Sequence, residues 1–570
     1  MARIETVSKA EAIKQQSRQL RGNLAEDLAD TAVPFDKTGY SLLKFHGIYQ
    51  GYDRDSATER KQRGDDKIWQ FMVRVRIPGG RLTADQYLAL DALADAHANG
   101  SLRITTRQSI QFHGVVKSGL KAAIADINRA LLTTLAACGD VVRTVTTVPA
   151  PIRDAVHTRL EDDARRLSTH LLPKTGAYHE IWVDGEKVAP EEEPVDPLYG
   201  ERYLPRKFKI GLAIPGDNTI DVLTNDLAIV ALFEGGLANR TLAGYNFLLG
   251  GGHGMTHNKP ETYPRLATPV AFVEPDDLLD AAAAVVRLHR DWGDRGNRRH
   301  ARLKYVIAER GEEWARERLS EDLGKALAAC RSMPDFDVPD HLGWHDQGDG
   351  KLYLGVPVPS GRIVDDERSR LRSALREIVA SFGVDPILMP SQDIILSEIA
   401  PADRAAITAV LRDHGVRLAE ELLPVERWAL ACPALPSCGL ALTEAERVQG
   451  DIVGAIAERL KRWGLEEERL SIRITGCPNG CARPYTGDIG IVGRVPGYYS
   501  LYVGGDFAGT RLNQAIAERL DIAGIADALD PLFALFASSR AAGEGFGDFC
   551  HRIDIAALQQ IVEGCRKKAA

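Results

Sequence analysis

Four of the eight cysteines in this chain fall within 50 residues, so a metal-binding residue type is concentrated in less than a tenth of the sequence. Cys432 and Cys438 have the spacing C-x5-C, and 38 residues later Cys477 and Cys481 have the spacing C-x3-C. Proline and glycine surround both pairs, which predicts loops whose backbone can approach sulfur closely. Four thiolates on loops can hold a tetrahedral zinc ion or an iron–sulfur cluster, and the spacing alone does not choose between them.

The other four cysteines, Cys138, Cys330, Cys550 and Cys565, are scattered along the chain. We interpret them as ordinary structural thiols, because isolated cysteines most often behave as small apolar residues.

Segments typical of β-strands carry hydrogen-bond donors on one face. In 71–77 the apolar residues alternate with Arg74 and Arg76, which places both arginines on the opposite face. In 207–214 the same alternation sets Lys207 and Lys209 apart from the apolar side chains, and 141–148 contributes Arg143. The longest such face, predicted as one strand over 102–113, collects Arg103, Thr105, Arg107, Ser109, Gln111 and His113.

Each of these faces, taken singly, is typical of a solvated edge strand. Taken together they carry almost no acidic residues, although the chain as a whole is acidic. Converging cations repel one another, so the pattern favours a site where a polyanion neutralises them. Arginine is well suited to carboxylates and small oxyanions because its donors form a planar fork.

An internal repeat indicates how these faces are positioned. Residues 77–82, Ile-Pro-Gly-Gly-Arg-Leu, recur as 358–363, Val-Pro-Ser-Gly-Arg-Ile, and each copy is followed by a predicted helix and strand. In the first copy Thr83 and Gln86 form a predicted capping box and Gly100 ends the helix. Such a long period predicts two related half-domains facing each other across a pseudo-two-fold axis, with a cleft between them. A weaker similarity relates 245–252 to 499–505.

The two copies differ in chemistry. Where the first has Arg107, Gln111 and His113, the second has Ser391, Ile395 and Ser397. One half therefore keeps a polar face and the other becomes apolar, which favours a ligand over a generic surface.

The length and composition of the chain indicate its general class. The chain has 570 residues, 44% of them hydrophobic and 26% charged, which is typical of several globular domains. Its net charge of −8 and pI near 6.0 predict no nucleic-acid or membrane partner. No apolar run approaches the ~18 residues of a membrane span, so we expect a cytoplasmic protein. The N-terminal stretch with Lys9, Lys14, Arg18 and Arg21 predicts a helix that either docks a partner or is simply solvated.

Six segments, in order along the chain, resemble the haemoprotein (beta) subunits of assimilatory NADPH-sulfite reductases, in the nitrite and sulfite reductase family. They are LKFHGIYQ (43–50), RVRIPGG (74–80), TRQSIQFHG (106–114), LPRKFK (204–209), TGCPNGC (475–481) and GEGFGDF (543–549). The resemblance covers almost the whole chain. The segment 139–143, Gly-Asp-Val-Val-Arg, departs from relatives that carry asparagine near the arginine.

The resemblance implies an α+β fold, a three-domain haemoprotein with a pseudo-two-fold repeat. Its ferredoxin-like half-domains would be 71–136 and 344–421, preceded by an N-terminal extension, 1–70. Two mixed α/β domains would complete it, a sirohaem and substrate domain at 137–343 and an iron–sulfur and sirohaem domain at 422–570.

The resemblance also implies two cofactors and their residues. A [4Fe–4S] cluster would be held by Cys432, Cys438, Cys477 and Cys481, with Cys481 also linking the cluster to sirohaem. The sirohaem carboxylates would be bound by Arg103, Thr105, Arg107, Gln111, His113 and Asn479. Sulfite would lie against Arg74, Arg143, Lys207 and Lys209.

The implied activity is the six-electron reduction of sulfite to sulfide in sulfate assimilation and cysteine biosynthesis. The chain has no G-x-G-x-x-G dinucleotide motif, so we expect a separate electron donor, a flavoprotein subunit or ferredoxin. A sirohaem-dependent nitrite reductase is the main alternative, disfavoured because Lys209 stands where those enzymes usually carry asparagine. A zinc-stabilised protein that binds a polyanion in its basic cleft is the third interpretation.

Overall fold

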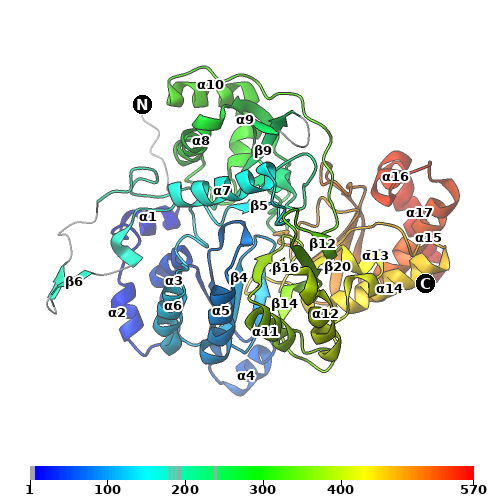
Figure 1. Ribbon diagram of the computed structural model, residues 1–570, viewed down its shortest axis with the longest axis horizontal. Helices are drawn as coiled ribbons and strands as arrows, with labels where there is room; N and C mark the ends of the chain where they lie inside the picture. Colours follow the sequence, from blue (N-terminus) through cyan, green and yellow to red (C-terminus); the bar gives the residue numbers. More distant parts are fainter. Residues whose placement is uncertain (1–6, 179–180, 184–185, 189–193, 236–239, 570) are drawn as a thin grey trace.

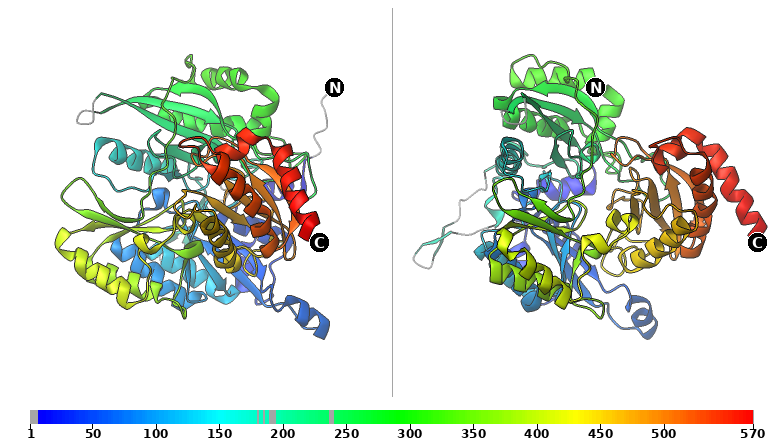
Figure 2. Two further views of the ribbon diagram at one scale, coloured as in Figure 1. Left: turned by 90° about the vertical axis from the view of Figure 1, so that its right-hand side faces the viewer. Right: turned by 45° about the vertical axis from the view of Figure 1, so that its right-hand side comes forward.

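The computed structural model describes residues 7–178, 181–183, 186–188, 194–235 and 240–569. Within them, four sheets of four or five strands form the framework, and β6 (Ile181–Val183) and β7 (Glu186–Val188) make a separate two-stranded sheet. Figure 1 shows α5, α6, α11 and α12 together along one edge of the molecule, and α8 to α10 at the opposite edge. In both views of Figure 2 the C-terminal helices lie on an outer face.

The two copies of the repeat form antiparallel sheets with the same strand order. In the first copy the order is β1-β2-β4-β3, and in the second it is β12-β13-β16-β15. Helices α5 and α6 accompany the first sheet, and α11 and α12 the second. The bounds are β1 Ile48–Tyr52, β2 Trp69–Arg74, α5 Ala84–His97, β3 Leu102–Ile104, β4 Ile110–Val115, α6 Leu120–Arg129, β12 Gly343–Asp346, β13 Leu352–Val356, α11 Leu371–Phe382, β15 Asp385–Leu388, β16 Ile394–Ile399 and α12 Arg404–Asp413.

Each copy also contributes a turn to the sheet of the other. The short strand β14 (Arg362–Ile363) of the second copy pairs with β3, and Arg81 of the first copy forms the matching bridge to Ile387. A Cβ on Gly80 would lie 2.4 Å from the Leu388 carbonyl oxygen, and one on Gly361 would lie 2.3 Å from that of Ile104. Both glycines have positive φ, so only glycine allows this reciprocal contact. The predicted pseudo-two-fold arrangement is confirmed.

The strand predicted over 102–113 is instead a hairpin, and this prediction was wrong. The chain turns between β3 and β4 at Gln108, whose φ is 48°. The hairpin register nevertheless sets Arg103 opposite Gln111, and Gln111 lies opposite Arg74 on β2. Three of the predicted donors therefore lie side by side across the sheet. The capping box at Thr83 is present as predicted.

The remaining two large sheets are mixed and also share one strand order. They run β5-β8-β9-β10-β11 and β17-β18-β19-β20-β21, and each has two parallel pairings followed by two antiparallel ones. The weak similarity between 245–252 and 499–505 begins on β10 and β20, which hold equivalent positions. The duplication therefore spans most of the chain.

Helices α7 and α14 connect the first two strands of these mixed sheets, and three further helices follow each sheet. The first set is β5 Thr146–Thr147, α7 Ala155–His170, β8 Ile210–Ala213, β9 Leu227–Glu234, β10 Thr241–Leu249, β11 Thr268–Val273, α8 Leu278–Trp292, α9 Leu303–Arg310 and α10 Glu312–Leu323. The second is β17 Ala429–Ala431, α14 Gln449–Arg462, β18 Ile472–Thr475, β19 Ile489–Val495, β20 Tyr498–Val503, β21 Gln514–Leu520, α15 Ile522–Ser539, α16 Phe546–Ile553 and α17 Ile555–Ala569, with α13 (Pro424–Arg427) before it.

Three large hydrophobic cores underlie this arrangement. One is shared by the two copies of the repeat, and each mixed sheet has a core of its own. The three-unit α+β class is therefore confirmed, while the domain boundaries stay a prediction. Cys138 and Cys550 are buried in these units, as expected of structural thiols, and the Cys565 side chain lies outside the described residues.

One helix bears on the expectation that no apolar run is long enough to span a membrane. Helix α15 is long and apolar enough, at a mean hydropathy of 1.4, to meet the criteria for a membrane span. Its sequence is not an uninterrupted apolar run, because Asp527 and Asp530 interrupt it. One face of α15 is buried against the hydrophobic core of the mixed sheet β17-β18-β19-β20-β21, where the helix packs on α14 and α17.

The sequence predicts that the N-terminal helix docks a partner or is solvated. Part of this helix, α1 (Lys9–Gln15), is instead buried against the rest of the chain, so the whole helix is not available for either. Lys14 and Glu11 are 2% and 1% exposed, and Lys14 Nζ donates a hydrogen bond of 2.6 Å to the Leu204 carbonyl oxygen. Helices α2 (Leu24–Ala29) and α3 (Lys37–Leu43) follow it, and α4 (Ala57–Arg63) lies at the lower edge of Figure 1.

Candidate functional site

The two cysteine loops leave one sheet edge side by side. Cys432 directly follows β17 and Cys477 follows β18, and because these neighbouring strands are parallel, their carboxyl ends meet. Cys432 Sγ accepts a hydrogen bond of 3.3 Å from the Gly476 N–H. A Cβ on Gly476 would lie 2.5 Å from the Thr443 carbonyl oxygen and 2.6 Å from Ala434 Cβ. Glycine at 476 therefore lets the two loops touch backbone to backbone.

The four thiols oppose one another's ionisation. Burial raises the pKa of Cys432, Cys438 and Cys477, the last to about 12, and the charge of Cys481 is the next cause in each case. None of the four is in a disulfide. Among the described residues, no three His, Cys, Asp or Glu side chains are arranged to hold a metal ion. Such mutually repelling sulfurs fit a cationic iron cluster, which would stabilise all of them as thiolates.

Asn479, predicted to contact the cofactor, lies against this group. Its backbone N–H and its side chain both donate to the Cys477 sulfur and lower the pKa of that thiol. The loop is fixed from outside by Met255, whose N–H donates to the Pro478 carbonyl oxygen at 3.0 Å.

Lys207 and Lys209 approach the same loop from the other mixed sheet. They precede β8 instead of lying in it, which corrects the predicted strand over 207–214. Burial lowers the pKa of Lys207 to about 7, with further lowering by Arg143. Burial lowers the pKa of Lys209 well below its usual range, and the charges of Lys207 and Arg107 lower it further. The charge of Cys481 opposes both shifts, so the lysines and this thiol lie within interaction range.

Arg107 and Arg143 complete the basic group around the lysines. Arg107 donates to Asn225 Oδ1 at 2.8 Å and to the carbonyl oxygens of Thr144 and Ile210, and burial lowers its pKa to about 9. Arg143 lies before the two-residue strand β5, not in a strand over 141–148, and donates to the Gly139 carbonyl oxygen at 3.1 Å.

The donors that lie side by side across the first sheet, Arg74, Gln111 and Arg103, differ in what they contact. With its amide oxygen turned toward Arg74, Gln111 accepts a hydrogen bond of 3.1 Å from Arg74 Nε. Arg103 is fully buried, forms an ion pair with Glu446 and donates to the Ala431 carbonyl oxygen at 2.9 Å. It therefore also anchors the strand that carries Cys432. Burial and three neighbouring arginines lower the pKa of His113 far enough to keep its ring neutral.

Two further sequence predictions can be compared with the structure. Thr105 uses its hydroxyl oxygen locally, accepting from the Arg107 N–H at 3.3 Å. Arg76, predicted to share a face with Arg74, is instead buried beyond the end of β2 and donates to Ser168 and to the Ala136 and Val142 carbonyl oxygens. Its role is structural, and the parity argument failed because the strand ends at Arg74.

The equivalent face of the second copy is apolar, as its sequence predicted. Ile395 lies between Gly355 and Ile387 across β16, β13 and β15. Ile387 and Ile395 pack with Tyr353 and Met389 in a small core. Among the described residues, the row of Arg74, Gln111 and Arg103 belongs to the first copy.

Sequence reasoning missed several buried polar residues near the loop. Both ring nitrogens of His253, Arg483 Nη1 and Arg107 Nε are buried without a hydrogen-bond partner among the described residues. Burial, Lys209 and nearby arginines keep His253 neutral by lowering its pKa. These unpartnered groups fit a large polyanionic ligand. His253 comes close to the cysteine loop at Gly480, where a Cβ would lie 3.1 Å from His253 Cβ.

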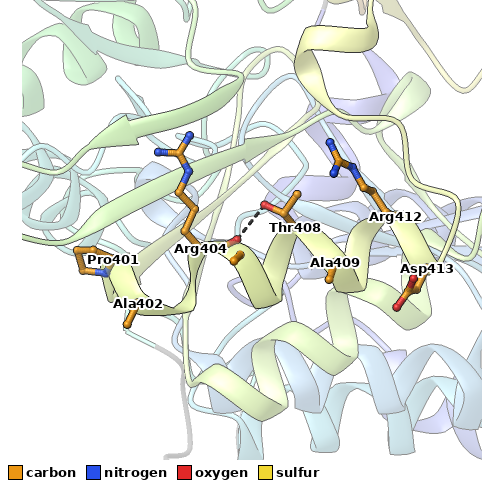
Figure 3. A pocket seen from close by; sticks show the side chains of 8 residues that line it. Pro401, Ala402, Arg404, Thr408, Ala409, Arg412 and Asp413 are labelled. Atoms are coloured by element: carbon orange, nitrogen blue, oxygen red, sulfur yellow. Dashed lines mark hydrogen bonds between the residues drawn. The ribbon is translucent and has the colours of Figure 1, made fainter.

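A shallow surface hollow along α12 contains none of the predicted site residues. Figure 3 shows its lining, which includes Arg404, Thr408 and Arg412. Thr408 donates to the Arg404 carbonyl oxygen at 2.8 Å, an ordinary helical contact. We therefore keep the cysteine and lysine group as the candidate site.

Two family models match the chain. The nitrite/sulfite reductase ferredoxin-like half domain matches residues 61–130, and the nitrite and sulphite reductase 4Fe-4S domain matches residues 162–327. The second match contains none of the four clustered cysteines, which lie in the other mixed sheet. The shared strand order of the two mixed sheets explains this, because the matched unit is the duplicated partner of the one that carries the thiols.

Curated relatives match nearly the whole chain. A sulfite reductase [ferredoxin] of Synechococcus elongatus is 44% identical over 99% of this chain and 92% of its own length. A sulfite reductase [NADPH] hemoprotein beta-component of Myxococcus xanthus is 46% identical over 96% of each chain. The Mycobacterium tuberculosis NirA structure matches with a TM-score of 0.77 at 24% identity, over 97% of this chain and 98% of that one, and so shares the fold.

Proposed function

This chain belongs to the nitrite and sulfite reductase family, and we propose that its clustered thiols and converging cations are the two sides of one sulfite-reducing site. It is an oxidoreductase that reduces sulfite, with sirohaem and a [4Fe–4S] cluster as cofactors. A zinc-stabilised binding protein is set aside on that ground.

The observation that carries the proposed site is the interaction of Lys207 and Lys209 with Cys481 across the two mixed sheets. We assign the cluster to Cys432, Cys438, Cys477 and Cys481, and the link between cluster and sirohaem to Cys481. We assign the sirohaem carboxylates to Arg103, Thr105, Arg107, Gln111, His113 and Asn479. When bound, these cofactors would pass electrons from the donor to sulfite, which no side chain can do.

The chain's own residues bind the oxyanion and move protons. Arg74, Arg143, Lys207 and Lys209 supply positive charge that balances the sulfite anion and the charge that develops on its oxygens. Each S–O bond that breaks releases its oxygen as water, so proton donors are required. Lys207 Nζ suits this role because its pKa of about 7 allows it to gain and lose a proton near neutrality.

The function is tested by steady-state assays of the cofactor-loaded protein with reduced methyl viologen. We expect sulfide from sulfite, with a higher kcat/KM for sulfite than for nitrite. Efficient reduction of nitrite alone would identify a nitrite reductase, and a colourless protein without iron would contradict both cofactors.

We propose that a separate donor protein supplies the electrons. Relatives of both the ferredoxin and the NADPH type support a donor that is either ferredoxin or a flavoprotein subunit. NADPH alone is expected to give no turnover, and addition of one of the two donors is expected to restore it. We further propose a cytoplasmic enzyme of sulfate assimilation and cysteine biosynthesis.

We predict that the titration of Lys207 shapes the pH dependence of kcat/KM for sulfite. Because its pKa is lowered to about 7, Lys207 is charged below pH 7 and loses its charge as the pH rises through that value. Wild-type kcat/KM for sulfite should therefore fall above pH 7. In Lys207→Arg the charge persists, so the ratio of variant to wild-type kcat/KM should rise by up to about tenfold per pH unit above 7.

Sulfite itself titrates in this range, but its titration cancels in that ratio. Lys325→Arg serves as the control, since Lys325 is exposed and pairs only with Asp277 among the described residues. A ratio for Lys207→Arg that stays constant from pH 6 to 9 would contradict the assignment.

A further inference from the structure

A second group of cations surrounds Asp140, next to the lysine pair. Asp140 accepts hydrogen bonds of 2.7 and 3.0 Å from Arg298, and Lys14 and Arg206 lie 3.6 and 4.0 Å from its oxygens. These cations lower the pKa of Asp140, so it is ionised at neutral pH.

Lys44 belongs to this group but has no carboxylate partner among the described residues. Its Nζ lies 3.7 Å from the centroid of the Tyr40 ring, on the half-buried start of the segment 44–46. The neighbouring Phe45 packs on Gly139, where a Cβ would lie 2.9 Å from the ring, so Lys44 is held beside Asp140. Burial lowers its pKa to about 8, and Arg298 adds to the effect.

Positive charge exceeds negative charge in this group. Arg298 and Lys14 balance the two carboxylates of Asp140 and Glu11, and Glu11 also pairs with Arg295. Lys44 and Arg206 remain as a surplus. Burial and the neighbouring Arg298 lower the pKa of Arg206 to about 10, as expected for cations that lack a full complement of anions.

The group is continuous with the proposed sulfite site and also reaches solvent. Arg206 precedes Lys207 in the chain and is one of the charges that lower its pKa. The side chains of Arg206 and Arg298 are 36% and 35% exposed. A line of cations therefore leads from the surface to the lysine pair.

We propose that Lys44, Arg206 and Arg298 form an outer oxyanion-binding site through which sulfite reaches Lys207 and Lys209. This inference rests on the proposed function. An electropositive approach concentrates a small dianion and raises its association rate by about 10- to 1,000-fold for a whole cleft. One cation of three should contribute a modest part of that gain. This cation should strengthen sulfite binding, and its effect should disappear at high salt, where its charge is screened.

Lys44→Gln tests the site in the cofactor-loaded enzyme with reduced methyl viologen. At low ionic strength we expect kcat/KM for sulfite to fall about 3- to 10-fold, with kcat retained. The difference should vanish near 1 M salt, where the screening length is about 3 Å. Lys44→Arg should restore kcat/KM, and Lys325→Gln at the remote surface should match wild type.

A second readout is the rate of the visible absorbance change on mixing the loaded enzyme with sulfite. Its second-order rate constant should fall in Lys44→Gln by the same factor as kcat/KM. Equal rate constants and equal kcat/KM for wild type and Lys44→Gln at low salt would overturn the outer site. A wild-type enzyme that fails to reduce sulfite would instead overturn the proposed function.

Discussion

Cys481→Ser is expected to yield a folded protein that has lost its iron–sulfur cluster and its ability to reduce sulfite. Cys481 is exposed, so its thiol contributes little to a hydrophobic core. Serine is a poor iron ligand because its hydroxyl stays protonated at neutral pH. Loss of a ligand should exceed the roughly 10- to 100-fold that outer-shell changes cost metal sites. We expect activity to fall on the order of a thousandfold, together with iron, acid-labile sulfide and visible absorbance.

Cys330→Ser is the matched control. Cys330 is half-buried and its thiol donates to the Phe247 and Ala271 carbonyl oxygens at 3.5 and 3.3 Å, which a serine hydroxyl can also do. This variant should keep iron content and sulfite reduction. Thermal unfolding of the apo forms checks that neither change disrupts the fold. Normal iron content and turnover in Cys481→Ser would remove Cys481 from the proposed ligand set.

The alternation of side chains along strands located much of the site from sequence. It placed Arg74 on the polar face of one strand and Arg103 and Gln111 on that of another, and the sheet register sets the three side by side. The same rule failed for Arg76, which lies past the end of β2 and turns into the interior. Parity holds only while the strand continues, and strand ends are set by tertiary pairing that a single segment does not encode.

The approach of the lysines to the thiols could not be predicted from sequence periodicity. Lys209 and Cys481 lie next to different sheets, so their interaction depends on how the two halves of the molecule pack. The family resemblance supplied the roles of both residues, while the structure supplies their electrostatic relation. The buried pair of Asp226 and Arg302, whose atoms lie 2.7 Å apart, had no sequence signal at all.

The duplication clarifies why each half contributes different chemistry. The Lys209 N–H donates to Asp226 Oδ2 at 2.9 Å, and the Ser471 N–H donates to Asp488 Oδ2 at 2.9 Å in the same place on the other mixed sheet. Lys209 and Ser471 are therefore structural equivalents. The two mixed sheets thus share one backbone framework. One sheet has a lysine directly before its second strand, whereas the other has cysteines in the loop after its second strand.

Lys209→Ala is expected to slow sulfite reduction by about 100- to 1,000-fold while both cofactors remain bound. Burial and the neighbouring cations lower the pKa of Lys209, so its protonated form gives up a proton readily, and burial makes its interaction with an oxyanion stronger than in water. Its removal should also release partly reduced sulfur, because later S–O cleavages would lack protons. Sulfide yield per electron consumed measures this leakage, and the visible spectrum reports cofactor content.

Two variants separate the roles of charge and proton transfer at Lys209. Lys209→Arg keeps a positive charge that arginine does not give up near neutrality, so it should recover sulfite binding, measured as KM, but little of kcat. Lys325→Ala, at an exposed lysine, should match wild type in both constants. If Lys209→Ala keeps its cofactors and still turns over sulfite to sulfide at the wild-type rate, Lys209 has no part in the reaction.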